Sequence, residues 1–292
     1  MKPAPFRYAD PDTLEEALAV LSDEGSGAKV LAGGQSLLPL LSMRLAAPTT
    51  LVDINRVPGL DSVEAGEDGV TVGALVRHNT LLGDDAAARI QPLLARATAN
   101  VAHPAVRNRG TTVGSIAHAD PSGEMTSVIA LTDGVVTVAE PAGERTVGWR
   151  DLFVGPLETS LHGPAVVTSA FFPALADRSG TAFAEVARRK GDYAVCGVGA
   201  VVRVDEDRRV SAVRASYVSV GLVPEVHDLT EAVVGRPADE ADWAAAGALA
   251  RTLVDPDSDI HASADYRRHL VGVLTERTLT TAAREALEKT AA

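Results

Sequence analysis

Residues 29–54 constrain the fold of this chain more than any other stretch, because they place a pair of glycines between a strand and a helix. Lys29-Val30-Leu31 is a short apolar run that predicts a buried strand, and Ala32-Gly33-Gly34-Gln35-Ser36 follows it directly. The amphipathic run 37–45 predicts a helix, and 50–54 predicts a second strand. The sequence therefore predicts a small N-terminal lobe of the β-loop-α-β kind.

Two changes of pattern further along the chain predict two more units. From about residue 60 onward, pairs of short apolar runs flank glycine-containing turns, as in β-hairpins, and alternate with helical stretches. Beyond the polar stretch 177–180, two long apolar runs, 194–204 and 210–220, predict two strands, and the rest of the chain has helical spacing. The expected fold class is α+β, with domain bounds at 1–56, 57–176 and 177–292.

Composition argues against several classes of function. The net charge of −12 argues against a nucleic-acid partner, because phosphate binding needs a clustered positive surface. The single cysteine, Cys196, allows no internal disulfide, and it cannot hold an iron–sulfur cluster alone, since a cluster needs about four thiolates. No zinc-type spacing occurs, and no apolar run is long enough to span a membrane. We therefore expect no metal site and a cytoplasmic protein.

The glycine pair of the first loop is compatible with ligand binding and equally with a tight turn that binds nothing. Without a Cβ, Gly33 and Gly34 let the chain approach another group closely, and consecutive N–H groups in such a turn can bind an anion. The Gln35 amide and the Ser36 hydroxyl can add hydrogen bonds. A tight strand-to-helix turn would select the same glycines for steric reasons, so the loop by itself leaves both interpretations open.

A second polar stretch, 107–124, is rich in glycine, small residues and hydroxyl groups, and we expect it to form a loop. It contains Thr111, Gly114 and Ser115 and ends at Glu124, whose carboxylate can accept hydrogen bonds from ribose or adenine groups. A long loop inside a compact domain usually serves a function, which favours a binding role over a solvated surface loop.

Six segments, in order along nearly the whole chain, resemble the FAD-binding subunits of molybdenum hydroxylases. They are FRYADPDTLEEALAVL, VLAGGQSLLPLLSMRL, LVDINRVPGL, HPAVRNRGTTVGSIAHADPSGEM, DLFVGPLETSL and RRKGDYAVCGVGA. That family includes the medium subunits of carbon monoxide dehydrogenase and the flavin domain of xanthine dehydrogenase. The resemblance implies a two-lobed FAD-binding domain similar to that of vanillyl-alcohol oxidases, then a C-terminal domain of antiparallel sheet and helices. It also implies that FAD binds without a covalent link.

The resemblance further implies which residues bind FAD. The first loop would wrap the pyrophosphate and the second would close on it, Glu124 would bind the adenosine side, and Asp192 and Tyr193 would approach the isoalloxazine ring. The expected FAD-binding residues are Leu31, Ala32, Gly33, Gly34, Gln35, Ser36, Leu37, Val101, Thr111, Gly114, Ser115, Ala117, Asp120, Glu124, Val167, Asp192 and Tyr193. One residue departs from the family pattern: Val113 stands where the first glycine of a pair is usual. We expect Val113 to keep ordinary dihedral angles.

The function that the resemblance implies is electron transfer within a complex. A large partner subunit would hydroxylate the substrate at a molybdenum cofactor, and [2Fe-2S] clusters of a small partner would deliver the electrons. FAD on this chain would pass them to an external acceptor, and the protein would position and tune the flavin without an acid–base catalyst. Two alternatives stay open. One is a stand-alone FAD-dependent oxidase or monooxygenase acting on a small molecule, and the other is a member that has lost flavin.

Overall fold

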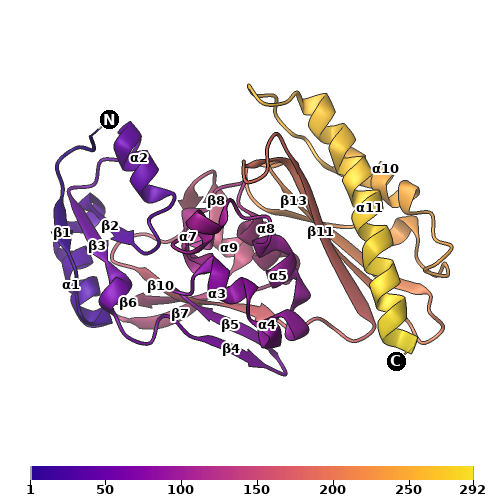
Figure 1. Ribbon diagram of the computed structural model, residues 1–292, viewed down its shortest axis with the longest axis horizontal. Coiled ribbons are helices and arrows are strands. Elements are labelled where there is room, and N and C mark those ends of the chain that lie inside the picture. The colour runs from indigo at the N-terminus through magenta and orange to yellow at the C-terminus, as the bar shows by residue number, and fades with distance from the viewer. Residues whose placement is uncertain (1, 292) are drawn as a thin grey trace.

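The computed structural model describes residues 2–291 and shows three main sheets in succession along the chain (Figure 1). The first sheet is parallel, because β1 and β2 both pair with β3 in the same direction. The elements of this unit, lobe 1, are β1 (Arg7–Ala9), α1 (Leu14–Glu24), β2 (Ala28–Leu31), α2 (Leu37–Met43) and β3 (Thr50–Asp53). The predicted β-loop-α-β arrangement is confirmed.

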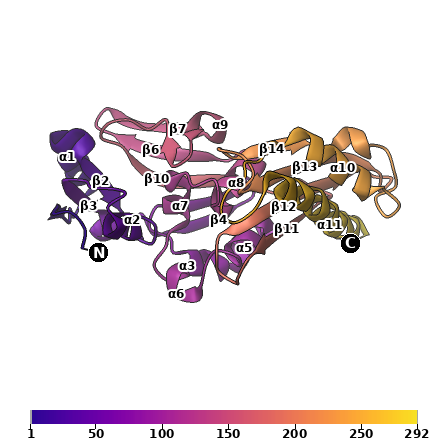
Figure 2. The same cartoon turned by 90° about the horizontal axis from the view of Figure 1, so that it is seen from above.

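The second unit, lobe 2, is a five-stranded antiparallel sheet with helices on one face (Figures 1 and 2). Its strand order is β4-β5-β10-β6-β7, so the last strand in sequence fills the centre between two hairpins. The strands are β4 (Val63–Gly66), β5 (Gly69–Gly73), β6 (Val135–Glu140), β7 (Gly143–Gly148) and β10 (Val166–Pro173). The helices are α3 (His78–Leu82), α4 (Asp85–Ile90), α5 (Pro92–Thr98), α6 (Pro104–Arg107), α7 (Thr112–His118) and α8 (Glu124–Leu131), and a short excursion adds α9 (Trp149–Leu152), β8 (Phe153–Gly155) and β9 (Glu158–Thr159).

The expectation that 107–124 forms a loop was wrong, because helix α7 occupies its centre. The Thr111 hydroxyl accepts a hydrogen bond of 3.1 Å from the N–H of Gly114, which caps the first turn of α7. Val113 and Ile116 are buried residues of this helix. A capping threonine and two apolar residues three apart therefore fold a segment whose composition is typical of a loop.

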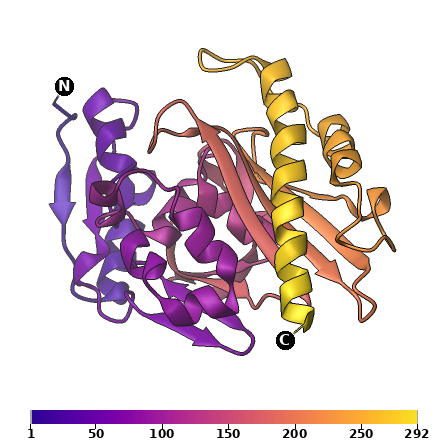
Figure 3. The ribbon, with the colours of Figure 1, turned by 45° about the vertical axis from the view of Figure 1, so that its right-hand side comes forward.

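The C-terminal domain is an antiparallel sheet of order β11-β12-β13-β14 with two helices on one face. The long helix α11 runs across the strands, as Figure 3 shows. Backbone contact is close, because a Cβ on Gly180 would fall 2.6 Å from the nitrogen of Ala286 on α11. The elements are β11 (Ser179–Ala187), β12 (Ala194–Val204), β13 (Val210–Val218), β14 (Glu225–Asp228), α10 (Trp243–Leu253) and α11 (Ala264–Ala291).

Two of these four strands, β11 and β14, were missed. The chain turns into β11 at Ser179, inside the polar stretch that had indicated a domain boundary. Its first residues are Ser, Gly, Thr and Ala, which give no apolar alternation, and cross-strand pairing with β12 fixes the strand instead. The expected α+β fold with an antiparallel C-terminal sheet is confirmed, and the domain bounds stay a proposal.

Buried apolar side chains form two clusters, of which one spans lobes 1 and 2 and the other belongs to the C-terminal domain. Both consist largely of alanine, valine and leucine, because aromatic residues make up only 4% of the chain. Cys196 is a buried member of the second cluster. No helix within residues 2–291 is both long enough and apolar enough to cross a membrane.

Candidate functional site

The two glycine-containing stretches lie against each other where lobe 1 meets lobe 2. A Cβ on Gly33 would press on the carbonyl oxygen of Arg109 and would fall 2.8 Å from Gly110 Cα and 3.0 Å from the Thr111 nitrogen. The backbones of the two stretches therefore touch at Gly33. Gly34 serves the turn itself, since its φ of +73° lies in the region that favours glycine.

Two side chains that the sequence analysis missed, Asn55 and Arg77, join these stretches by hydrogen bonds. Asn55 Nδ2 donates to the carbonyl oxygen of Ala32 at 2.8 Å. Arg77 donates to Asn55 Oδ1 at 2.5 Å and to the carbonyl oxygen of Arg109 at 2.8 Å. Burial lowers the pKa of Arg77, and the charge of Arg109 lowers it further. The bridge thus runs from the first loop to the second through one amide and one guanidinium.

The first loop offers hydrogen-bond donors to a ligand. Within residues 2–291, the backbone N–H groups of 33–36 donate to no other group, and the Ser36 hydroxyl makes no capping hydrogen bond to α2. Four consecutive free N–H groups on a glycine turn are suited to an anion such as a pyrophosphate. This set of donors, together with the contact at Gly33, fits the phosphate portion of FAD.

Helix α7 carries small residues on its less buried side. Gly114 and Ala117 lie on the less buried side of the helix, and His118 continues this side by one position. Burial lowers the pKa of His118 and the charge of Lys29 on β2 lowers it further, although Asp120 opposes the change. Val113 is 1% exposed and has no positive φ, so the expectation for its backbone is confirmed.

A third group of expected residues lies where α8 meets the C-terminal domain. Glu124 begins α8 and is 8% exposed, and burial raises its pKa to about 7. Tyr193 is 63% exposed as a residue. Partial burial and the charges of Asp120 and Glu124 raise the pKa of Tyr193 to about 12. These three residues therefore share one acidic region. Glu185 on β11, which the sequence analysis missed, belongs to it as well, because burial and the charge of Glu124 raise its pKa to about 8.

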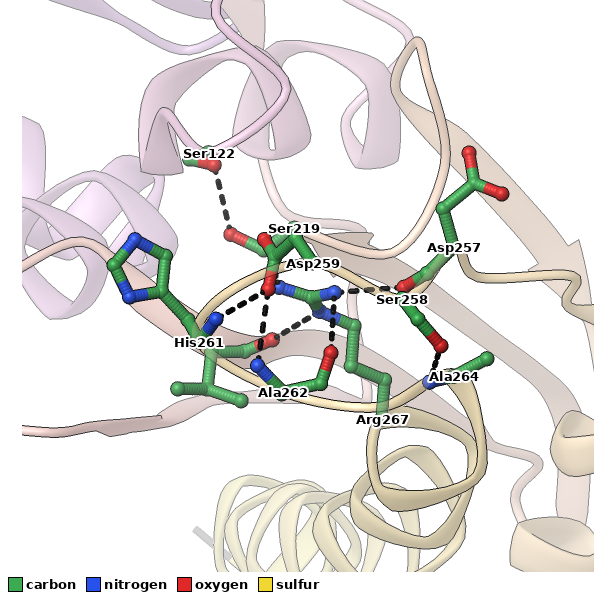
Figure 4. A network of polar contacts seen from close by, with 10 residues as sticks. Ser122, Ser219, Asp257, Ser258, Asp259, His261, Ala262, Ala264 and Arg267 are labelled. Carbon is green, nitrogen blue, oxygen red and sulfur yellow. Dashed lines mark hydrogen bonds and ion pairs between the residues drawn. The ribbon is translucent and has the colours of Figure 1, made fainter.

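Polar contacts hold the loop before α8 against the C-terminal sheet (Figure 4). The N–H of Ser219 donates to the carbonyl oxygen of Pro121 at 3.0 Å. The Ser219 hydroxyl also donates to the Ser122 hydroxyl at 2.9 Å. The end of β13 thus fixes the loop that carries Asp120.

The structure brings most of the expected residues together in two neighbouring regions, but not all of them. Val101 is buried between α5 and α6, and Val167 is half-buried on β10. Valine side chains make no hydrogen bonds, so Val101 and Val167 can contact a ligand only through van der Waals packing. Of the other expected residues, 31–37 lie at the connection between β2 and α2, and Thr111 caps α7. Gly114, Ser115 and Ala117 lie on α7, and Asp192 and Tyr193 lie just before β12.

Comparison with known proteins gives the same family over both halves of the chain. A family model described as "FAD binding domain in molybdopterin dehydrogenase" matches residues 4–175, and one described as "CO dehydrogenase flavoprotein C-terminal domain" matches residues 181–282. The nicotine 6-hydroxylase medium subunit of Paenarthrobacter nicotinovorans is 41% identical, over 96% of this chain and 98% of that protein. The carbon monoxide dehydrogenase medium chain of Hydrogenophaga pseudoflava is 33% identical, over 97% of this chain and 98% of that protein.

Solved structures agree with these matches. The quinoline 2-oxidoreductase from Pseudomonas putida 86 has a chain that superposes with a TM-score of 0.92 at 37% identity, covering 98% of this chain and all of that one. A carbon monoxide dehydrogenase from Hydrogenophaga pseudoflava superposes with a TM-score of 0.90 at 33% identity, covering 97% and 98%. The chain therefore belongs to the family of FAD-binding medium subunits of molybdenum hydroxylases.

Proposed function

We propose that this chain carries electrons from iron–sulfur clusters of a small partner subunit, through its FAD, to an external acceptor. A large subunit with the molybdenum cofactor would complete the complex and would determine the substrate. The observation that carries the proposal is the set of four free N–H groups on 33–36, held against the second stretch by Gly33. The names of the relatives support it, since they are subunits of dehydrogenases and hydroxylases.

In this proposal the residues of the chain bind and orient the cofactor, while FAD supplies the one-electron and two-electron chemistry that no side chain provides. The N–H groups of 33–36 would hold the pyrophosphate, and the Asn55–Arg77 bridge would keep both stretches at the right spacing. Glu124 would accept hydrogen bonds from FAD hydroxyl groups, and Tyr193 would lie beside the flavin ring. A single cysteine, buried in the C-terminal core, supports the assignment of the clusters to a partner.

The roles of the individual site residues, the two partners, the acceptor and the cytoplasmic location are all parts of this proposal. The test uses the chain carrying an affinity tag, co-expressed with its large and small partners. We expect a three-subunit complex that contains FAD and whose flavin absorbance is bleached when substrate is added without acceptor. Addition of the acceptor should restore the absorbance.

Two results would replace the proposal by its alternatives. If the chain purified alone binds FAD and a small molecule bleaches it without any partner, the chain is a stand-alone flavoenzyme. If the complex forms but neither contains FAD nor takes up added FAD, the chain is a member that has lost flavin.

A further inference from the structure

Tyr193 ends a short loop, 188–193, that connects β11 to β12. Two residues beyond it, the carbonyl oxygen of Val195 accepts a hydrogen bond of 3.2 Å from Arg267. Two residues before it, Gly191 packs against the side chain of His103, which belongs to lobe 2. The chain is therefore held on both sides of Tyr193, once from its own domain and once from the other.

The contact between Gly191 and His103 brings backbone against the face of a ring. A Cβ on Gly191 would lie 2.5 Å from Cε1 and 2.7 Å from both ring nitrogens of His103. An atom that approached Cε1 from the edge of the ring would be clearly farther from the two nitrogens, so this Cβ would lie over the ring face. Carbon atoms in normal contact are about 3.5–4.0 Å apart, so not even a methyl group fits between them. The φ of Gly191, +86°, independently favours glycine.

The polar contacts of the loop do not attach it to lobe 2. Within residues 2–291, the hydrogen bonds and ion pairs of 188–192 join members of the loop to one another. The N–H of Asp192 donates to the carbonyl oxygen of Arg189 at 3.1 Å, which closes a turn. Arg188 and Asp192 form an exposed ion pair at 3.9 Å, and such a pair contributes little to stability. Packing on His103 is thus the contact by which lobe 2 holds this loop.

Local hydrogen bonds fix the backbone of His103. Its carbonyl oxygen accepts from two N–H groups of α6 at 2.9 and 3.0 Å. The Arg107 guanidinium donates to the carbonyl oxygens of Val101 and Ala102 at 2.8 and 3.0 Å, which closes the segment around His103. A few residues later the same stretch packs on Gly33. One stretch of lobe 2 therefore contacts the first glycine loop at one end and the loop of Tyr193 at the other.

We propose that His103 positions Tyr193 beside the flavin ring by holding loop 188–193 through the backbone of Gly191. His103 is a positioning residue, and its role rests on the place proposed for Tyr193 next to the flavin. Because its stretch also packs on Gly33, His103 would align the flavin end of the site with the pyrophosphate end.

The first measurement needs no flavin. Arg188, Arg189 and Lys190 are exposed and make the loop a substrate for trypsin, whose cleavage there follows the population of detached loop. In the full chain, His103→Ala and Gly191→Ala should each speed cleavage at 188–190 by about fivefold or more, the factor for losing one modest contact. His103→Phe keeps a flat ring and should stay near the rate of the intact chain. Mass spectrometry of the fragments assigns the cleavage to this loop.

A matched control separates the contact from backbone strain. Gly235→Ala places alanine at a φ of +74° in the same domain, but a Cβ there would meet nothing within 4 Å. It should therefore leave cleavage at 188–190 unchanged. In the double variant His103→Ala with Gly191→Ala, the two effects should not add, because both remove the same contact. An unchanged rate in His103→Ala, or additive effects in the double variant, would overturn the proposal.

The second measurement tests the consequence for FAD bound to the full chain. Aromatic rings stack with an offset, and a tyrosine ring stacked on a flavin quenches the flavin fluorescence by donating an electron to the excited ring. Tyr193→Leu should therefore raise the fluorescence of bound FAD, His103→Ala should raise it as well, and His103→Phe should not. A rise in Tyr193→Leu without one in His103→Ala would overturn the proposal.

The two measurements fail separately. Unchanged fluorescence in Tyr193→Leu would contradict the place proposed for Tyr193 itself. The cleavage rates decide whether His103 holds the loop in that case too, and also in a chain that binds no FAD.

Discussion

Replacing Gly33 with alanine tests whether contact between the two glycine stretches organises the FAD site. The added methyl group would press on backbone atoms of 109–111, including Gly110 Cα at 2.8 Å. No side-chain rotation can relieve this overlap, so the two stretches must move apart. The φ of Gly33 is not positive, and alanine therefore introduces the overlap without backbone strain.

The size of the effect follows from these distances. Carbon atoms in normal contact are about 3.5–4.0 Å apart, so the stretches must separate by about 1 Å. Overpacking of this kind costs about 1–3 kcal/mol. If that energy opposes assembly of the site, the Kd for FAD rises about 5-fold to 150-fold, since 1.4 kcal/mol corresponds to a factor of ten.

The assay is titration of FAD into apoprotein, followed by the change in flavin fluorescence, with thermal unfolding measured in parallel. Gly66→Ala is the matched control, because Gly66 has no positive φ and a Cβ there would meet nothing within 4 Å. Equal Kd values and equal unfolding temperatures for Gly33→Ala and Gly66→Ala would refute the idea that close contact at Gly33 matters.

Three further predictions concern the bridge, the family departure and the domain interface. Arg77→Ala should weaken FAD binding by about 1.5–3 kcal/mol in the same titration, because hydrogen bonds from a charged group are lost. Arg77→Lys should recover only part of the lost affinity for FAD. Val113→Gly should lower the free energy of unfolding by about 2–4 kcal/mol in urea, through a cavity and a helical glycine, and tighter FAD binding in this variant would contradict the structure. Arg96 pairs with Glu285 at 2.6 Å between α5 and α11, and Arg96→Ala should destabilise the chain by about 1–3 kcal/mol. Burial alone would raise the pKa of Glu285, but hydrogen bonds from Arg96 and other donors lower it. The stabilisation from this ion pair should therefore be lost in acid. Calorimetry at decreasing pH should show that the unfolding temperature of Arg96→Ala falls less steeply than that of the intact chain.

The sequence predicted well those parts of the fold whose cause is local. The strand at 29–31, the glycine turn and the following helix are set by apolar spacing and by the φ that Gly34 adopts. The hairpins of lobe 2 follow from turns that contain glycine. Strand β11 could not be predicted in this way, because its first half holds Ser179, Gly180 and Thr181, and only its pairing with β12 and the close approach of α11 make it a strand.

In the candidate site too, residues of local motifs could be predicted, and residues that act through distant contacts could not. The glycine loop and Glu124 could be found in the sequence because they belong to contiguous motifs that resemble a known family. Asn55 and Arg77 could not, because each acts through a partner distant in the chain. Asn55 follows the buried strand β3 by two residues, and a polar residue in this place is a local signal that its side chain points into a site.

The C-terminal domain contributes to the site by fixing where β12 begins. Arg267, which is 6% exposed, donates to the carbonyl oxygens of Val195 and Asp257 at 3.2 and 2.7 Å and to the carboxylate of Asp259 at 2.8 Å. Figure 4 shows this guanidinium at the centre of the loop before α11. Because Val195 follows Tyr193 by two residues, the contacts that fold this loop also fix the position from which Tyr193 projects. Through Val195, Tyr193 is thus positioned by contacts within its own domain, whereas the loop that carries Asp120 in lobe 2 is held by Ser219 of the C-terminal domain.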